Sequence, residues 1–185
     1  YWYQLGPTKR FAVVPPASER KLPCLDRIIA AVGLLDPQRH GPGEVVVQEG
    51  VLWPEGGQVF FRPASDADGW YEIPFAVKVR EPRRLILNLT RSYDYGIYQA
   101  FVDGVKIGNP IDLYAADTQV KEYSLLDFWP EPGTHTVRLQ CIGKSDNSAA
   151  NYLGVVSVLL RERRPCVSEY GHDKDKDWKE NPVLY

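Results

Sequence analysis

The chain has 185 residues, of which 44% are hydrophobic, 12% aromatic and 25% charged, which is enough to bury one sizeable core. Its 22 Lys and Arg against 24 Asp and Glu give a net charge of -2, and with no positive excess to neutralise a phosphate backbone, nucleic acid is excluded as a partner. No stretch reaches the roughly 18 consecutive apolar residues of a membrane-spanning helix, so membrane insertion is excluded as well. Because the chain starts at Tyr1 and contains no Met, we expect a mature product or a segment of a longer protein.

Residues 1–43 are predicted to form an extended N-terminal arm. Its prolines favour a polyproline-type backbone, and it ends in the breaker sequence His-Gly-Pro-Gly at 40–43. Within the arm, residues 22–35 place apolar side chains at helical spacing, which predicts one short amphipathic helix. Those side chains are Leu25, Ile28, Ile29 and Val32.

Residues 44–161 consist of short β-branched and aromatic runs separated by turn residues, the pattern of an antiparallel all-β domain. Leu85, Leu87 and Leu89 are predicted to share one face of a strand, and Asp103-Gly104 predicts a two-residue hairpin turn. This number of strands in one domain predicts a two-sheet antiparallel jelly-roll sandwich. The expected strands are residues 45–53, 58–62, 71–79, 85–90, 97–102, 123–126, 136–142 and 152–160.

Residues 162–185 are predicted to form a C-terminal arm. Charges of both signs alternate along 172–180, and the arm carries Tyr170, Trp178 and Tyr185, unlike a disordered tail of one charge sign without aromatic residues. In an extended backbone Asp173, Asp175 and Asp177 would share one face, as in an edge strand docked on a surface.

The three cysteines limit the disulfide chemistry of the chain. Their spacing excludes a zinc site or a CxxC redox motif, and Cys141 falls inside a predicted strand, where we expect it to be buried. Cys24 and Cys166 lie one in each arm, so a disulfide between them, within one chain or between two, would fasten the arms and would require an oxidising compartment.

Several motifs resemble, in chain order, the galactose-binding-like jelly roll that many carbohydrate-binding modules use; the resemblance covers roughly residues 69–161. The motifs are Gly-Trp-Tyr-Glu-Ile-Pro-Phe at 69–75, Ser-Tyr-Asp-Tyr-Gly-Ile-Tyr at 92–98, Val-Asp-Gly at 102–104, Leu-Tyr at 113–114, Gly-Thr-His-Thr-Val at 133–137 and Asn-Tyr-Leu-Gly at 151–154.

The N-terminal arm carries a second resemblance. Tyr1-Trp2-Tyr3-Gln4, the Pro-rich segment and Leu22-Pro23 are similar to the end of the catalytic part in the glycoside hydrolase family of difructose-anhydride synthases and α-fructofuranosidases. The resemblance implies that this chain is the C-terminal accessory part of such a protein. The catalytic glutamates would then lie upstream of Tyr1, so we expect no catalytic residue and no enzyme activity in this chain.

The residues themselves mark no catalytic site. A glycosidase needs two carboxylates at a set separation, and a sequence supplies no distances. The three histidines lie far apart, with no nucleophile motif or metal-ligand spacing around them. The acids of the β region are Glu72, Asp94, Asp103, Glu122 and Asp127, and the histidines are His40, His135 and His172.

No cofactor is predicted, although structural calcium is left open. The resemblance implies a calcium site near the terminal strand, but Val155 and Val156 stand where the family often has an acid. Residues 173–177 have the opening rhythm of a calcium loop, yet Trp178 occupies the position of the sharp-turn glycine and no Glu follows at the twelfth position.

Carbohydrate is the predicted ligand, because sugar rings bind to an aromatic platform flanked by amides, carboxylates or Arg. Several loops of the predicted sandwich supply such residues, and a jelly roll can gather its loops at one end. Trp70, Tyr98 and Tyr152 fit a buried core equally well, and that alternative stays open. The candidate ligand residues are Trp70, Arg91, Tyr93, Asp94, Tyr95, Tyr114, Trp129, Asp146 and Asn147.

The arms predict a second kind of partner, a further copy of the chain. Ordering them costs on the order of 1–2 kcal/mol per residue, which contacts with their own domain or with a neighbouring subunit must offset. We therefore expect a secreted or cell-surface, bacterial-type, non-catalytic carbohydrate-binding module. The alternative is a structural subunit of a self-assembling extracellular filament, tube or other homo-oligomer, held by arm residues Tyr1, Trp2, Tyr3, Trp178, Leu184 and Tyr185.

Overall fold

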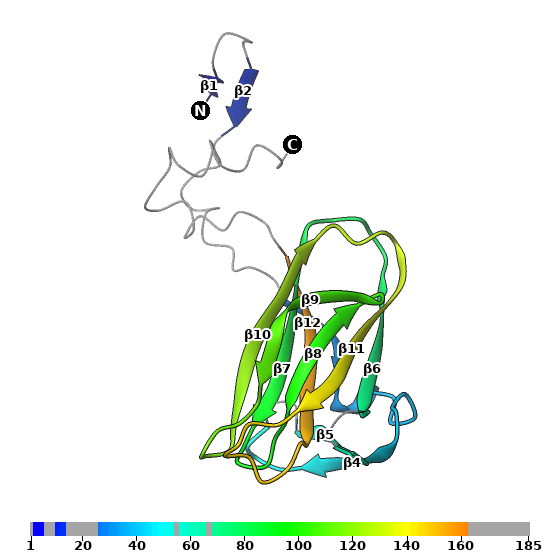
Figure 1. Ribbon diagram of the computed structural model, residues 1–185. Coiled ribbons are helices and arrows are strands. Elements are labelled where there is room, and N and C mark those ends of the chain that lie inside the picture. The colour runs from blue at the N-terminus through cyan, green and yellow to red at the C-terminus, as the bar shows by residue number, and fades with distance from the viewer. Residues whose placement is uncertain (1, 6–9, 14–25, 54–55, 66–67, 163–185) are drawn as a thin grey trace. The chain divides into compact units, whose positions relative to one another are not determined.

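The computed structural model describes residues 2–5, 10–13, 26–53, 56–65 and 68–162 (Figure 1). The chain divides into two compact units, one formed by Tyr1–Leu25 with Arg163–Tyr185 and the other by Asp26–Glu162. In the first unit, β1 (Trp2–Leu5) pairs antiparallel with β2 (Arg10–Val13). The other described strands belong to the second unit.

The second unit is a sandwich of two antiparallel sheets, which confirms the predicted all-β jelly-roll fold. One sheet has the order β10-β7-β12-β5-β4, with β3 also paired to β12, and the other has the order β6-β11-β8-β9. The first sheet contains β3 (Asp26–Ala31), β4 (Gly43–Glu49), β5 (Gly57–Pro63), β7 (Arg83–Arg91), β10 (Gln119–Phe128) and β12 (Leu153–Glu162). The second contains β6 (Trp70–Val77), β8 (Ile97–Val102), β9 (Val105–Asp112) and β11 (Gly133–Gly143).

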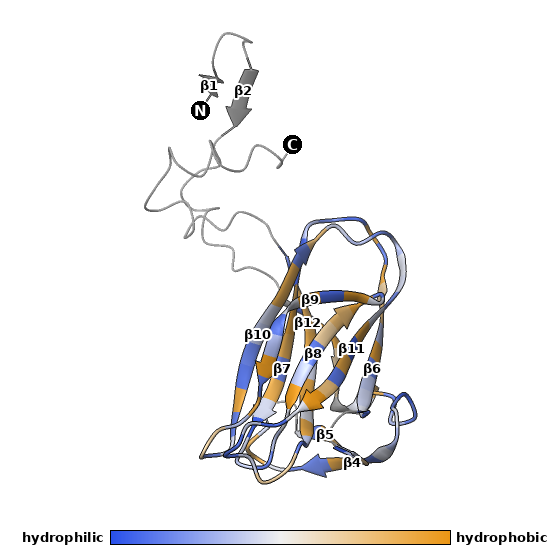
Figure 2. Cartoon of the chain, viewed as in Figure 1, coloured by the Kyte–Doolittle hydropathy of each residue, from blue (hydrophilic) through white to orange (hydrophobic). Residues whose placement is uncertain are grey.

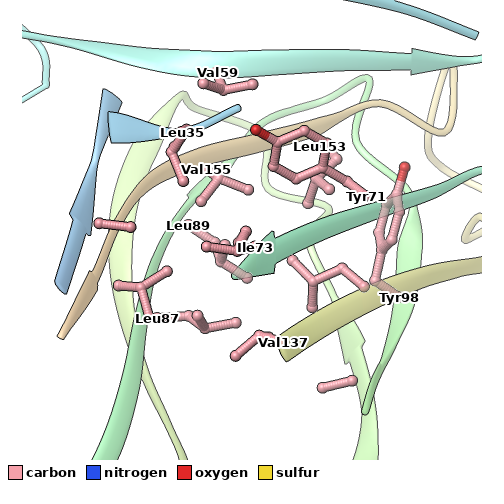
Figure 3. Close-up of a cluster of buried hydrophobic side chains, with 14 of the residues drawn as sticks. Leu35, Val59, Tyr71, Ile73, Leu87, Leu89, Tyr98, Val137, Leu153 and Val155 are labelled. Carbon is pink, nitrogen blue, oxygen red and sulfur yellow. The ribbon is translucent and has the colours of Figure 1, made fainter. Parts of the chain in front are cut away.

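The core lies between the two sheets. Leu85, Leu87 and Leu89 of β7 are fully buried, as their alternation predicts. Figure 3 shows Leu87 and Leu89 in one cluster with side chains of the facing sheet, among them Val137. Hydrophobic and hydrophilic residues alternate along several strands (Figure 2), so each sheet turns an apolar face to the other.

The predicted helix is wrong over the described residues. Residues 26–31 form strand β3, and only one 3-10 turn, η3 (Val32–Leu34), follows. Ile28 and Ala30 pair with Leu159 and Val158 of the central strand β12, and Ala30 is buried. The sheet thus extends further toward the N-terminus than the expected range 44–161.

The Asp103-Gly104 turn joins β8 to β9 as predicted, with Val102 paired to Val105. Asp103 has φ of 50° and Gly104 φ of 79°, the left-handed values that a tight hairpin of this kind requires. Cys141 is buried in β11, which confirms that prediction.

The predictions for the arms fall largely outside the described residues. The Cys24–Cys166 disulfide, the calcium-like segment 173–178 and four arm residues (Tyr1, Trp178, Leu184 and Tyr185) are not described. Trp2 and Tyr3 belong to β1. Within the described ranges, no helix has the length and hydropathy needed to cross a membrane.

Candidate functional site

Three loops meet at one end of the sandwich, which we call the loop end: residues 92–96, 113–118 and 144–152. They meet because Arg91 at the end of β7 pairs with Gln119 at the start of β10, while Gly143 at the end of β11 pairs with Ile97 at the start of β8. At the opposite end of the sandwich, the first residue of β3, Asp26, pairs with Arg161 of β12 (Figure 1). The chain thus enters and leaves this unit away from the loop end.

Backbone hydrogen bonds fasten the three loops to one another. The Ser92 N–H donates to the Leu113 carbonyl at 3.1 Å, and the Ala149 N–H donates to the Tyr93 carbonyl at 2.9 Å. Two isolated parallel bridges, Ser92 with Tyr114 and Tyr95 with Tyr152, add to these contacts. These contacts join the three loops into one surface.

Buried polar side chains anchor the loops from below. The Ser148 hydroxyl lies 2.7 Å from the carbonyl oxygens of both Tyr95 and Ala150. The Asn151 amide donates to the Ser65 carbonyl at 2.9 Å, and both Ser148 and Asn151 are buried. Sequence reasoning did not single out Ser148 and used Asn151 only as part of the Asn-Tyr-Leu-Gly motif, because Ser and Asn in a loop are ordinary turn residues.

Tyr93 is the aromatic residue that this surface presents to solvent. Its side chain is 56% exposed, while its carbonyl is held by the neighbouring 144–152 loop. Exposed Asp146 and Asn147 and half-buried Asp94 belong to the same loops. This arrangement offers a ring face with carboxylates and an amide at one end of the molecule.

Arg91 and Tyr114 border the same loops. The Arg91 guanidinium donates to the Tyr114 carbonyl at 2.6 Å, and both side chains are half-buried. The bond ties the end of β7 to the 113–118 loop, so part of the hydrogen-bonding capacity of Arg91 is already in use within the fold.

Two of the other three predicted ligand residues, Tyr95 and Trp129, lie away from this surface, whereas Trp70 lies near the loop end, at the start of β6 and paired with Gln140 of β11. Tyr95 is buried in the core, at 4% exposure. Trp70 packs beneath the Arg138 guanidinium, 4.3 Å from the ring centroid, and against the backbone of Gly41. Trp129 directly follows β10, whose last residue, Phe128, pairs with Arg83 at the end opposite the loops.

A hydrogen-bonded network lies under the loop end and holds Tyr95 in place. The Trp53 indole N–H donates to the Thr90 hydroxyl at 3.0 Å, and that hydroxyl donates to Gln58 Oε1 at 2.6 Å. The Gln58 amide donates in turn to the Tyr95 hydroxyl at 3.0 Å. Burial raises the pKa of Tyr95, and the hydrogen bond with Gln58 only partly offsets that rise, so this hydroxyl stays protonated. Gln58, which directly precedes the apolar run Val59-Phe60-Phe61 of β5, is the sequence signal for this network.

Four of the five acids considered as catalytic carboxylates are paired with cations. Asp127 lies 2.7 Å from Arg84 and Glu122 3.0 Å from Arg161. Glu72 lies 3.8 Å from Arg138, and Asp103 lies 2.7 Å from His135. The fifth, Asp94, belongs to the loop end. The described part of the chain brings no three His, Cys, Asp or Glu side chains together in a way that could hold a metal ion.

Comparisons with known proteins place the fold. No family model and no curated protein matches the chain. A xanthan lyase from Paenibacillus is similar in structure, with a TM-score of 0.60 and 21% identity over 66% of this chain and 12% of the lyase. A family 35 carbohydrate binding module from Clostridium thermocellum superposes with a TM-score of 0.49 and 13% identity, over 74% of this chain and 97% of the module. The similarity to the lyase shows that this chain shares the fold of one part of that much longer protein.

Proposed function

We propose that this chain is a non-catalytic carbohydrate-binding β-sandwich and that the loop end is its sugar-binding surface. The observation that carries the proposal is the Tyr93 ring, more than half exposed on a backbone that hydrogen bonds hold fixed. The apolar C–H face of a sugar ring stacks on such an aromatic face, and a pre-formed platform loses little conformational entropy on binding.

The polar side chains around Tyr93 suit the hydroxyl rim of a sugar. Asp94 and Asn147 supply carboxylate and amide oxygens that accept hydrogen bonds from hydroxyls, and the Asn147 amide also donates. Arg91 and Tyr114 add donors on the side of the 113–118 loop. A single aromatic platform with a few polar neighbours on an open surface favours a short saccharide unit within a polymer over a fully enclosed small molecule.

The proposal includes an accessory role in a larger extracellular or cell-surface protein. Its support is the resemblance of the N-terminal arm to the end of the catalytic part in the difructose-anhydride synthase and α-fructofuranosidase family. Both chain connections of the sandwich also leave from the end opposite Tyr93, so an attached domain would enter away from the loops. An accessory module of this kind would hold its partner enzyme close to a polysaccharide.

The test is to titrate the full chain with soluble polysaccharides, including fructans and xanthan, and to measure binding by calorimetry. Tyr93→Ala should weaken binding about tenfold or more, which corresponds to roughly 1.4 kcal/mol. Trp129→Ala is the matched control, because Trp129 is similarly exposed, at 46%, but lies at the opposite end. The loop-end site is refuted if no polysaccharide binds, or if Trp129→Ala weakens binding as much as Tyr93→Ala.

The alternative function, a self-assembling subunit held by its arms, depends on residues outside the described ones and stays a prediction. Deleting residues 1–20 or 166–185 should then leave a folded monomer and abolish oligomers in light scattering. A chain that is monomeric both before and after the deletion contradicts that alternative.

A further inference from the structure

Strand β4 is the least protected edge of the two sheets. Sheet edges normally carry features that discourage pairing with another chain, such as Pro, Lys or a bulge. β6 has Pro74, and β9 has Lys106 and Pro110. The β10 ladder is irregular between Ser124 and Leu126, and the ladder of β3, which pairs with β12, is irregular between Val158 and Leu159. β4 has no Pro, no Lys and an unbroken register with β5 from Gly43 to Glu49.

The hydrogen-bond pattern shows which backbone groups of β4 face outward. The Ala64 N–H donates to the Pro42 carbonyl at 3.0 Å, and the Gly50 N–H donates to the Gly56 carbonyl at 3.3 Å, one just before and one just after β4. Hydrogen-bonded pairs alternate along an antiparallel ladder, so the even-numbered residues of β4 bond to β5. The odd-numbered residues then direct their N–H and C=O groups away from the sheet; they are Gly43, Val45, Val47 and Glu49.

Apolar side chains are exposed along and just beyond this edge, beside the exposed Glu44 and Glu49. Val47 is 54% exposed, and Val51 and Leu52, just beyond the end of β4, are also exposed. The centre of the strand, Val45 to Val47, is a β-branched run without a charge, a composition that favours pairing with another strand.

We propose that β4 pairs antiparallel with β4 of a second copy of this chain, about a two-fold axis at Val46. In that register Val45 lies opposite Val47 of the second copy and Gly43 lies opposite Glu49, so every outward donor of the edge meets an outward acceptor. The charges agree with this register: Glu44 lies opposite Gln48, and no carboxylate lies opposite another. The two copies would join their larger sheets into one continuous sheet.

The first test is the mass of the full chain by sedimentation at increasing concentration. We expect the wild type to approach twice the mass of one chain. Val47→Lys should remain monomeric, because it brings two ammonium groups close to the two-fold axis and buries them. Val105→Lys is the matched control and should still dimerise, because Val105 is 64% exposed on the protected edge strand β9.

A charge exchange separates loss of pairing from loss of folding. Val47→Glu should be monomeric like Val47→Lys, yet an equimolar mixture of the two should dimerise. The two side chains at position 47 lie diagonally across the axis, about 7 Å apart, which long side chains span. A mixture that stays monomeric overturns the proposal, as does a wild-type chain that is monomeric at all concentrations.

A crosslink tests the register. In the proposed pairing the two Val46 residues face each other in a non-hydrogen-bonded pair, with Cα atoms about 4.5 Å apart, within the range of a disulfide. Val46→Cys, in a chain with Cys24 and Cys166 changed to Ser, should therefore form a covalent dimer under mild oxidation. If this variant stays monomeric under those conditions, pairing through β4 is overturned. Pairing through β4 is also overturned if removing residues 166–185 abolishes the dimer while the Val47→Lys variant still dimerises.

Discussion

The hydroxyl of Tyr98, a fully buried residue of β8, donates a hydrogen bond to the backbone carbonyl of Asn151, with 2.7 Å between the oxygens. The bond joins the centre of the core to the 144–152 loop. Because burial raises the pKa of Tyr98 strongly, the hydroxyl remains a donor at all ordinary pH values. A residue of the core thus helps to hold one of the three loops of the loop end in place.

Tyr98→Phe should lower the free energy of unfolding by about 1 to 3 kcal/mol, because it leaves a buried carbonyl without its donor. Urea denaturation measures the change. Tyr93→Phe is the matched control, since the side chain of Tyr93 is more than half exposed, and should shift stability by less than about 0.5 kcal/mol. Equal stabilities of Tyr98→Phe and the wild type would contradict the role given to this bond.

Gly154 lies against the polar network beneath the loops. A Cβ atom at this position would clash with Gln58 Oε1 and would stand 2.9 Å from the Tyr95 hydroxyl. Gln58 could move aside only by giving up its buried hydrogen bonds to Thr90 and Tyr95. Gly154→Ala should therefore cost about 2 kcal/mol or more, from overpacking and from polar groups left unpaired.

Gly33→Ala is the control for that substitution. A Cβ at Gly33 would meet no atom within 4 Å, so stability should change little. The midpoint of thermal or urea unfolding measures both variants. If Gly154→Ala proves as stable as Gly33→Ala, the network does not hold Gly154 as closely as the structure indicates.

Alternation between apolar and polar residues predicted the strands well because it reflects a local property, the two faces of one strand. Leu85, Leu87 and Leu89 show this most clearly. β3 was missed because its pairing partner, β12, is more than a hundred residues away along the chain. Over six residues, Ile28 and Ile29 fit a helical and an extended pattern equally well, and only the distant ladder decides between them.

The sequence predicted which types of residue form the candidate site, but it predicted only some of the residues that lie there. Turn chemistry placed Tyr93, Asp94 and Asn147 in loops, but nothing in the sequence shows which loops share an end. Trp129 was grouped with them because it is an aromatic residue after a strand, whereas the direction of β10 places it at the far end. Tyr95 has the same loop context as Tyr93, and only the folded structure, through its burial and its contact with Gln58 in β5, identifies it as a core residue.

At the end opposite the loops, both ring nitrogens of His135 face hydrogen-bond acceptors. Nδ1 lies 2.7 Å from Asp103 Oδ2, and Nε2 lies 2.7 Å from the Glu131 carbonyl oxygen. Two acceptors require two donors, so this geometry selects the protonated imidazolium, stacked 5.4 Å from the Phe75 ring centroid. Burial lowers the pKa of His135, but the hydrogen bonds to Asp103 and Glu131 raise it more, and the net pKa lies above the ordinary value of 6.5.

This raised pKa makes part of the stability dependent on pH. A group whose pKa is higher in the folded than in the unfolded state stabilises the folded protein. Its contribution is complete when the pH is below the unfolded-state pKa, and it is lost as the pH rises through the folded-state pKa. The difference in the free energy of unfolding between wild type and His135→Gln should therefore be larger at about pH 6 than at about pH 8.5. Urea denaturation across this range measures it, with Asp103→Asn expected to reduce the pH dependence because it removes the carboxylate partner. A difference between wild type and His135→Gln that stays constant with pH would show that the imidazolium contributes nothing to holding the Asp103 turn against β11.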